Sequence, residues 1–503
     1  MALAQSCNQI VLHDIATIGA LEALVGTSNQ VAYLGSYLSD MGAAWAIEES
    51  HYIDRDYLDD FAAFYGKSAR GFPNHCRRLH FFRGPRIDRK GLEALLGGDA
   101  DVADAVTVDY LGFCVVRPIP RAPLGRTVLG WYGHADPPRV VAPTKRPYVT
   151  HLAGFKFTVH GLAWQQQDAS VARCATVAVW TMLQALSLDA RYAAPTTAEV
   201  TRLAHAAGGP RLGRIFPSAG LDATQVVAAI EACQLAPLVI GGDLTDDIEG
   251  HSFSSEAFAQ QICVLLRSGF PVLVVGRYPG GQNHAVCAVG FRDVPVLAAV
   301  VDGVRIHESN VSCYYLHDDN IGPAARFRLG ERRARLMAEA PQRAGQPRGR
   351  PAQTPDFVPK LLIAAVPKGL CISPRAMLDE VERLAAAWLA ATHQTGITLS
   401  VRYALASELL GRHLPTTLQG RDAVLGRVRL EVAENVEGLS LYVGVATLSQ
   451  GQANLAEIWF DTTDADVHLR VLANIGYVSA FIRQFRTVAR RLRVDLGRDF
   501  DAW

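Results

Sequence analysis

The sequence lacks several features that would point at once to a class of protein. Its 49 basic and 49 acidic residues give a formal net charge of zero, so neither nucleic acid nor an anionic membrane is an expected partner. No apolar run of roughly 18 or more residues occurs, and the chain does not begin like a signal peptide, so we expect no membrane span and a cytoplasmic location. Phosphate-loop, dinucleotide-binding and His-Glu-x-x-His motifs are also missing, and we therefore expect no cofactor and no metal.

The cysteines are scattered and contain no Cys-x-x-Cys pair. There are nine of them, an odd number, which indicates a reducing compartment rather than a disulfide framework or a zinc site. Most should be inert core residues, as we expect for Cys233, Cys263 and Cys287. A reactive cysteine must therefore be recognised by its surroundings.

Length and hydrophobic content indicate a multidomain globular protein. The chain has 503 residues and is 49% hydrophobic, which is too long for a single core. The expected fold class is α+β, with a central unit of helices followed by an antiparallel sheet, flanked by two α+β units. The predicted boundaries are an N-terminal domain at 1–154, a central domain at 155–330, a Pro- and Arg-rich linker at 331–356, and a C-terminal domain at 357–503.

Local patterns in the outer domains predict further elements. In the C-terminal domain, Ser373 and Pro374 open a helix as its N-cap and first residue. An acidic, aromatic run at 54–60 predicts the solvated start of a helix with Asp56 as the N-cap, because its spacing does not match a calcium loop. Strands are predicted at 106–118, 298–301 and 428–432, and a helix at 466–492.

The most informative stretch is a polar loop that leads directly into an apolar helix predicted at 174–186. Cys174 stands at the junction, where the helix dipole and unpaired backbone N–H groups favour the thiolate, which is the reactive form of cysteine. Glutamines lie just upstream. Gln167 is the preferred donor for an oxyanion, with Gln166 as the alternative.

Two later segments supply candidates for a base and for a group that orients it. His284 follows a glycine turn at the start of a predicted strand, which leaves its imidazole at a sheet edge. A strand near 312–316 leads into a polar cluster, in which Asp318, Asp319 or Asn320 could hold the imidazole tautomer. Asp318 is the preferred residue of the three.

Gln167, Cys174, His284 and Asp318 follow one another in the order found in papain-like cysteine peptidases. The segments from Asn283 and from Leu316 resemble those of the bacterial branch that processes bacteriocin leaders at double-glycine sites. The resemblance covers about 160–330. It implies a Cys174–His284–Asp318 triad, with Gln167 and the Cys174 backbone N–H in the oxyanion hole, and it makes hydrolysis of a peptide bond in a protein or peptide substrate the default reaction.

The sequence leaves three points open: which reaction is catalysed, whether the protein is catalytic at all, and what the flanking domains do. Isopeptide cleavage and transglutamination use the same constellation of residues as peptide hydrolysis. A non-catalytic papain-like scaffold that binds a partner is the alternative from a different class. The flanking domains could also serve a regulatory protein partner.

Overall fold

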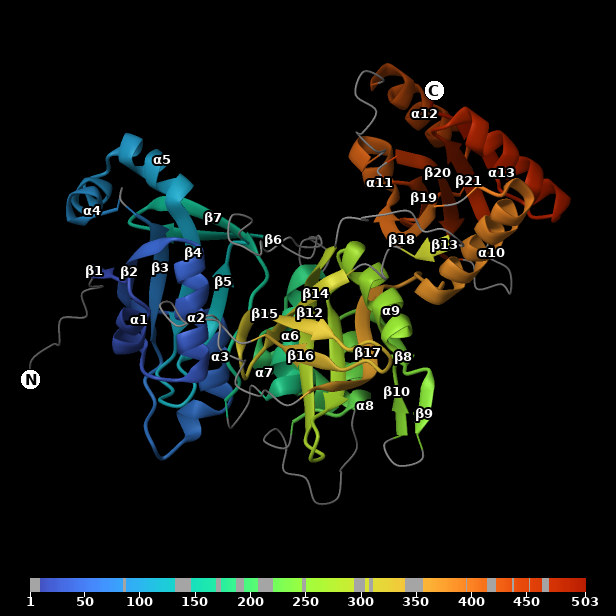
Figure 1. Ribbon diagram of the computed structural model, residues 1–503. Helices are drawn as coiled ribbons and strands as arrows, with labels where there is room; N and C mark the ends of the chain where they lie inside the picture. The colour runs from blue at the N-terminus through green and yellow to red at the C-terminus, as the bar shows by residue number, and fades with distance from the viewer. Residues whose placement is uncertain are drawn as a thin grey trace, which may run out of the picture. The chain divides into compact units, whose positions relative to one another are not determined.

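A computed structural model describes the chain from residue 10 to residue 503 with several gaps, and it is a mixed α+β structure, as expected (Figure 1). The gaps are at 85–86, 132–145, 169–172, 187–193, 207–219, 247–249, 294–303, 307–310, 340–355, 395, 414–421, 437, 452 and 464–469. The strand predicted at 298–301 lies outside the described residues. No described helix is both long and apolar enough to cross a membrane.

The chain divides into two compact units, and each is built from separate stretches of sequence. Unit 1 comprises 1–253, 269–292 and 313–365, and unit 2 comprises 254–268, 293–312 and 366–503. The division differs from the one predicted from sequence, because the predicted N-terminal and central domains fall in one unit. The segments before and after the predicted linker at 331–356 contribute strands to the same sheet.

The N-terminal part of unit 1 is a five-stranded antiparallel sheet in the order β1-β2-β3-β4-β5. Its strands are β1 (Ile10–Asp14), β2 (Ala43–Tyr52), β3 (Cys76–Arg83), β4 (Tyr110–Val116) and β5 (Leu124–Leu129). Its helices are α1 (Ile18–Val25), α2 (Asn29–Asp40), α3 (Arg55–Ala63), η1 (Tyr65–Lys67), α4 (Arg89–Leu96) and α5 (Ala100–Asp109), and the hairpin β6 (Arg146–Leu152) and β7 (Phe155–Gly161) follows.

The second part of unit 1 is a seven-stranded sheet in the order β16-β15-β14-β12-β11-β17-β8, preceded in sequence by helices. The helices are α6 (Cys174–Leu186), α7 (Thr197–Ala206) and α8 (Ala223–Ala232). The strands are β8 (Leu235–Gly241), β11 (Val272–Arg277), β12 (Asn283–Asp293), β14 (Val311–Asp318), β15 (Gly322–Leu329), β16 (Leu336–Ala338) and β17 (Val358–Pro367), and a small hairpin pairs β9 (Leu244–Asp246) with β10 (Gly250–Ser252).

Strand β17 explains why the predicted boundary at 357 does not separate two domains. Its Leu361, Leu362, Ile363 and Ala364 pair with β11, and its central residues are buried. A short, continuous apolar strand of this kind is typical of the interior of a sheet, and β17 lies between β11 and β8. The sheet is therefore completed by sequence that follows the predicted linker.

Unit 2 is built on a six-stranded sheet in the order β13-β18-β19-β20-β21-β22. The strands are β13 (Val304–Ile306), β18 (Ile397–Leu405), β19 (Tyr442–Gln450), β20 (Ala453–Asp461), β21 (Val471–Gly476) and β22 (Arg498–Asp501). The helices are α9 (Ser255–Arg267), α10 (Pro374–Thr392), α11 (Ala406–Glu408), η3 (Leu409–His413), α12 (Asp422–Asn435) and α13 (Ser479–Arg491).

Several local predictions can be compared with the elements that form. Ser373 caps α10 by accepting from the Ala376 N–H, with Pro374 in the first turn, as expected. The strand prediction was wrong for 106–109, which end α5, and for 428–432, which lie in α12. Val428 and Val432 are apolar helix residues in the core of unit 2, so a buried helical stripe was misread as a strand. The range 466–492, predicted as one helix, holds strand β21 followed by helix α13.

Candidate active site

Cys174 is the first residue of α6 and is half-buried, whereas the helix residues that follow it are mostly buried. The helix begins here because the Val177 N–H already donates to Arg173 O, and an unbroken apolar run follows. The cysteine thus lies at the helix end where backbone N–H groups have no helical partner. This is the position expected from the sequence.

His284 is held between two aromatic rings near the start of β12, and only 4% of it is exposed. The Tyr278 ring stacks on the imidazole at a centroid distance of 5.4 Å, and the Phe357 ring meets it edge-on at 5.9 Å. These contacts fix the plane of the imidazole. Tyr278 and Phe357 were not identified from the sequence, because Phe357 comes from a distant segment whose proximity depends on the pairing of β11 with β17.

Asp318 ends β14 and makes the shortest carboxylate contact with His284. Its Oδ1 lies 3.2 Å from His284 Nε2 and also accepts the Asn320 backbone N–H at 2.8 Å. Its backbone carbonyl accepts from Trp164 Nε1 at 3.1 Å. The carboxylate therefore has a fixed position, and it can hold the imidazole with its other nitrogen, Nδ1, directed away from the carboxylate.

The Cys174 side chain also interacts with His284 and helps to raise its pKa, so the thiol lies near the imidazole that contacts Asp318. Burial alone would lower the pKa of His284. The negative charge of Asp318, its hydrogen bond, the interaction with Cys174 and the charge of Asp319 outweigh burial and raise that pKa well above its ordinary value. The site thus favours an imidazolium beside the cysteine.

The other two candidates for the orienting group lie close by. Asp319 Oδ1 is 3.5 Å from His284 Nε2, and Asn320 Nδ2 is 3.4 Å from it. Burial raises the pKa of Asp319 to about 7; Asp318 adds to this rise, and His284 opposes it. Asp319 is therefore a second carboxyl group next to the imidazole, and one that exchanges its proton near neutral pH.

Gln167 also lies at this cluster, although its side chain is engaged. Its Nε2 donates to Asn320 Oδ1 at 2.7 Å, which leaves the second N–H of the amide for another acceptor. Gln166, the alternative, is buried and its Oε1 accepts the Leu124 N–H. The structure thus brings together all four residues singled out from the sequence, and it turns Gln166 to a different partner.

The polar loop before Cys174 is held by the N-terminal sheet. Trp164 forms an antiparallel bridge with Thr127 of β5, and the Gln166 N–H donates to Leu124 O. The buried Arg117 donates to Gln166 O at 2.8 Å and lies 3.5 Å from the buried carboxylate of Asp168. No local pattern predicted this support, because both segments resemble an ordinary strand and an ordinary loop.

The turn that carries Asp318 is held by helix α2. Gln30 Nε2 donates to Asp319 O, and Tyr33 Oη donates to Ala324 O, both at 3.2 Å. Gly322, with φ +156°, leaves room for the Tyr33 ring, since a Cβ there would lie 2.1 Å from Tyr33 Cδ1. The N-terminal part of unit 1 therefore supports both the cysteine loop and the aspartate turn.

Within the described part of the chain, His284, Asp318 and Asp319 also form the one group whose side chains converge as metal ligands would. Their ligand atoms all lie within 4.8 Å of one another. One imidazole nitrogen and two carboxylates would suit a divalent cation of borderline hardness. The same atoms are those of the hydrogen-bonded His–Asp pair described above, so the two uses exclude each other.

Comparison with known proteins adds no family to these observations. Neither protein-family models nor curated proteins match the chain. The chemistry of the site therefore has to be judged from its own geometry.

Proposed function

We propose that the protein is a thiol hydrolase of papain-like architecture that uses a Cys174–His284–Asp318 triad. The observation that carries the proposal is the imidazole of His284, which contacts Asp318 at 3.2 Å and interacts with the Cys174 side chain at the start of α6. A nucleophile, a base and an orienting group are the minimum for covalent catalysis of this kind. The order of elements, with the cysteine helix before an antiparallel sheet that carries the histidine and the aspartate, supports the same reading.

In the first half of the reaction, the Cys174 thiolate attacks the carbonyl carbon of the substrate and a carbon–sulfur bond forms. The imidazolium of His284 gives its proton to the leaving amine as the carbon–nitrogen bond breaks. The Cys174 backbone N–H and the remaining N–H of the Gln167 amide are the donors for the developing oxyanion. An acyl thioester and a free amine result.

In the second half, water attacks the thioester while His284 takes a proton from it. The carbon–sulfur bond breaks, the carboxylic acid leaves, and the thiol–imidazole pair is restored. Asp318 orients and stabilises the imidazolium throughout. If an amine replaces water, the same steps give transfer instead of hydrolysis, so the residues define acyl transfer and the accessible nucleophile decides the product.

The experiment is incubation of the purified protein with a peptide library and mass-spectrometric detection of new termini. Cleavage that requires Cys174 and survives Cys371→Ser supports the proposal, since Cys371 is an exposed cysteine outside the site. New amide bonds in place of new termini would identify a transferase. If no acyl–enzyme and no product form with the wild-type protein, the non-catalytic scaffold is the better reading.

A metal centre is the second candidate function, favoured by the convergence of His284, Asp318 and Asp319 within 4.8 Å. The two functions respond in opposite ways to a chelator. The thiol enzyme keeps its activity after treatment with EDTA and loses it when Zn²⁺ is added. A metal-dependent enzyme loses activity in EDTA and regains it when the metal is restored.

A further inference from the structure

A polar cavity lies in unit 1, away from His284. Its volume is about 390 Å³, within the range of small-molecule sites, which begins at roughly 300 Å³. It is lined by residues from α3, β5, β6 and the far end of α6: Arg55, Asp56, Arg126, Arg146, Pro147, Tyr148, Val149, Gln184 and Ala194. Because α6 rises ~1.5 Å per residue, Gln184 lies roughly 15 Å along the helix from Cys174.

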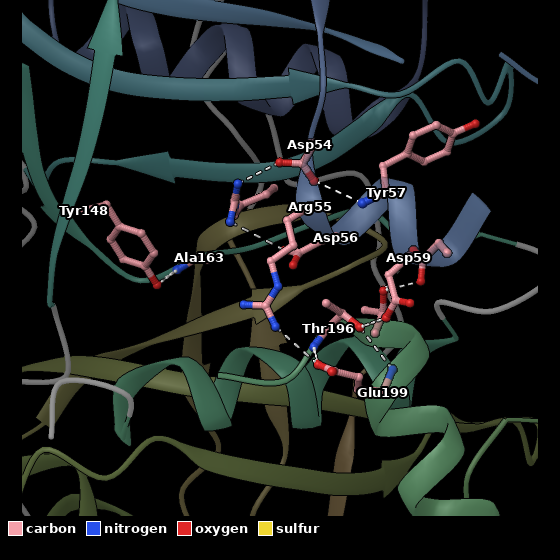
Figure 2. Close-up of polar contacts among 12 residues, drawn as sticks. Asp54, Arg55, Asp56, Tyr57, Asp59, Tyr148, Ala163, Thr196 and Glu199 are labelled. Atoms are coloured by element: carbon pink, nitrogen blue, oxygen red, sulfur yellow. Dashed lines mark hydrogen bonds and ion pairs between the residues drawn. The ribbon is translucent and has the colours of Figure 1, made fainter. Parts of the chain in front are cut away.

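Arg55 and Asp56 of the acidic run at 54–60 line this cavity, and the run is not the solvated helix start predicted from sequence. Asp54, rather than Asp56, is the N-cap of α3, because its side chain accepts from the Tyr57 N–H. Asp54, Asp56 and Asp60 are buried. Figure 2 shows this run, which includes Arg55, beside Tyr148 and the start of α7. Arg55 reaches Glu199 of α7.

Most charges around the cavity are already paired. Arg126 donates to Asp54 at 2.7 Å, and Arg55 contacts Glu199 at 3.4 Å. Asp56 is 6% exposed and its Oδ2 makes no hydrogen bond; its nearest cation, Arg126, is 3.7 Å away. A buried carboxylate oxygen without a donor is costly, and a ligand that donates to it would remove that cost.

Arg146 is the second incompletely paired charge. It stacks over the Tyr148 ring at 4.5 Å and donates to Gln184 O at 2.7 Å, but its buried Nε has no hydrogen-bond partner. No ion pair joins it to an acidic side chain among the described residues. Its guanidinium is therefore rigidly held and still free to bind an anionic group bidentately.

The two incompletely paired charges are of opposite sign, and they line one cavity. We propose that this cavity binds a small zwitterion, a free α-amino acid or a dipeptide. Arg146 would receive the carboxylate and Asp56 the ammonium group. Pro147, Val149 and Ala194 supply an apolar wall for an aliphatic side chain. A phosphate or a simple carboxylic acid would leave Asp56 unpaired, and a metal ion would meet three arginines.

The test is isothermal titration calorimetry of the full chain with L-leucine, L-alanyl-L-alanine, N-acetyl-L-leucine and L-leucinamide. The last two compounds each remove one of the two charges. At least one zwitterion should bind saturably, and for L-leucine both analogues should bind at least ~10-fold more weakly, since each lost charged contact is worth more than about 1.4 kcal/mol. The Cys174→Ala protein should bind equally well, which keeps this result independent of the proposed function.

Variants of the two charged residues sharpen the assignment. Arg146→Gln should weaken L-leucine more than L-leucinamide, and Asp56→Asn should weaken L-leucine more than N-acetyl-L-leucine. Arg89→Gln is the matched control, because Arg89 is an exposed arginine paired with Glu93 outside the cavity. Wild-type protein with the four ligands answers the question even if a variant fails to fold.

The pH dependence gives an independent check on the role of Asp56. Burial raises its pKa to about 6; Asp54 and Glu199 add to the rise, and Arg126 and Arg55 oppose it. Ligand affinity should therefore increase as the pH rises from about 5 to about 7 and the carboxylate ionises. Equal binding of N-acetyl-L-leucine, competition by inorganic phosphate, or no saturable binding of either zwitterion up to ~10 mM would each overturn the proposal.

Discussion

The carboxylates beside His284 and those beside Arg126 are both buried, but they face different partners. Asp318 and Asp319 lie 3.2 and 3.5 Å from an imidazole, which can gain and lose a proton and which also interacts with the Cys174 side chain. Asp54 and Asp56 face Arg126, a guanidinium that stays charged at any ordinary pH. His284 can pass a proton between neighbouring groups, whereas the Arg126 guanidinium can only hold its charge. Burial of carboxylates therefore does not by itself identify an active site.

The largest effect should follow from His284→Gln. Without a base beside Cys174, we expect kcat/KM for a cleaved peptide to fall by roughly 10²- to 10⁴-fold. Asp60→Asn is the comparison change at another buried carboxyl group of α3, where Thr197 Oγ1 lies 2.8 Å from both carboxyl oxygens. It should leave kcat/KM unchanged. Equal losses in the two variants, measured on the same substrate, would mean that the two groups do not differ as described.

The next largest effect should follow from Arg117→Met. We expect it to lower the stability of the fold and, through the loop that carries Cys174, the activity. The change removes the cation beside the buried Asp168 carboxylate, which costs about 3–5 kcal/mol. Thermal unfolding should shift to a clearly lower temperature, and the double variant Arg117→Met/Asp168→Leu should recover part of the loss. Arg89→Met, at an exposed pair, should stay within about 0.5 kcal/mol of wild type. An unchanged melting temperature in Arg117→Met would contradict the proposed support of the cysteine loop.

Asp318→Asn should narrow the pH range of activity from its basic side. Asp318 is the main group that raises the pKa of His284, so its charge and hydrogen bond hold the imidazolium to higher pH. Without them, burial dominates and the pKa of His284 falls. The basic limb of the kcat/KM profile should therefore move to lower pH. A limb that stays where it is would assign the orienting role to another residue.

Asp319→Asn should have the same sign of effect on His284 but a smaller one, because Asp319 is the last of the groups that raise that pKa. It should also change the stability profile. The pKa of Asp319 is about 7 in the fold and about 4 in an unfolded chain, so the folded state loses stability as the pH rises between these values. The variant should lose this pH dependence in thermal unfolding. A shift of the basic limb larger than that of Asp318→Asn would reverse the two roles.

The sequence predicted the site residues better than it predicted their support. Cys174 could be found because a polar loop changes to an apolar helix at one residue, and His284 because a glycine turn precedes a strand. Both are local signals. Arg117, Tyr33 and Phe357 support the site from distant segments, and their roles depend on pairings such as that of β11 with β17.

Element type was predicted best where capping chemistry was clear, as at Ser373 and Pro374. It failed where apolar residues are few and closely spaced, as at Val428 and Val432, since a short apolar run fits either a helix or a strand. The compact units also differ from the predicted domains. Strand β13 pairs with β18 of unit 2, and β17 pairs in unit 1, so the chain crosses between units more often than its composition changes.

The most direct test of the Cys174–His284 pair is the rate of alkylation of each cysteine by iodoacetamide across pH, resolved by peptide mass spectrometry. In the wild-type protein, Cys174 should react fastest. In His284→Ala this advantage should disappear. If Cys174 reacts no faster than the exposed Cys371, or if its profile is the same without His284, the proposed catalytic pair is wrong.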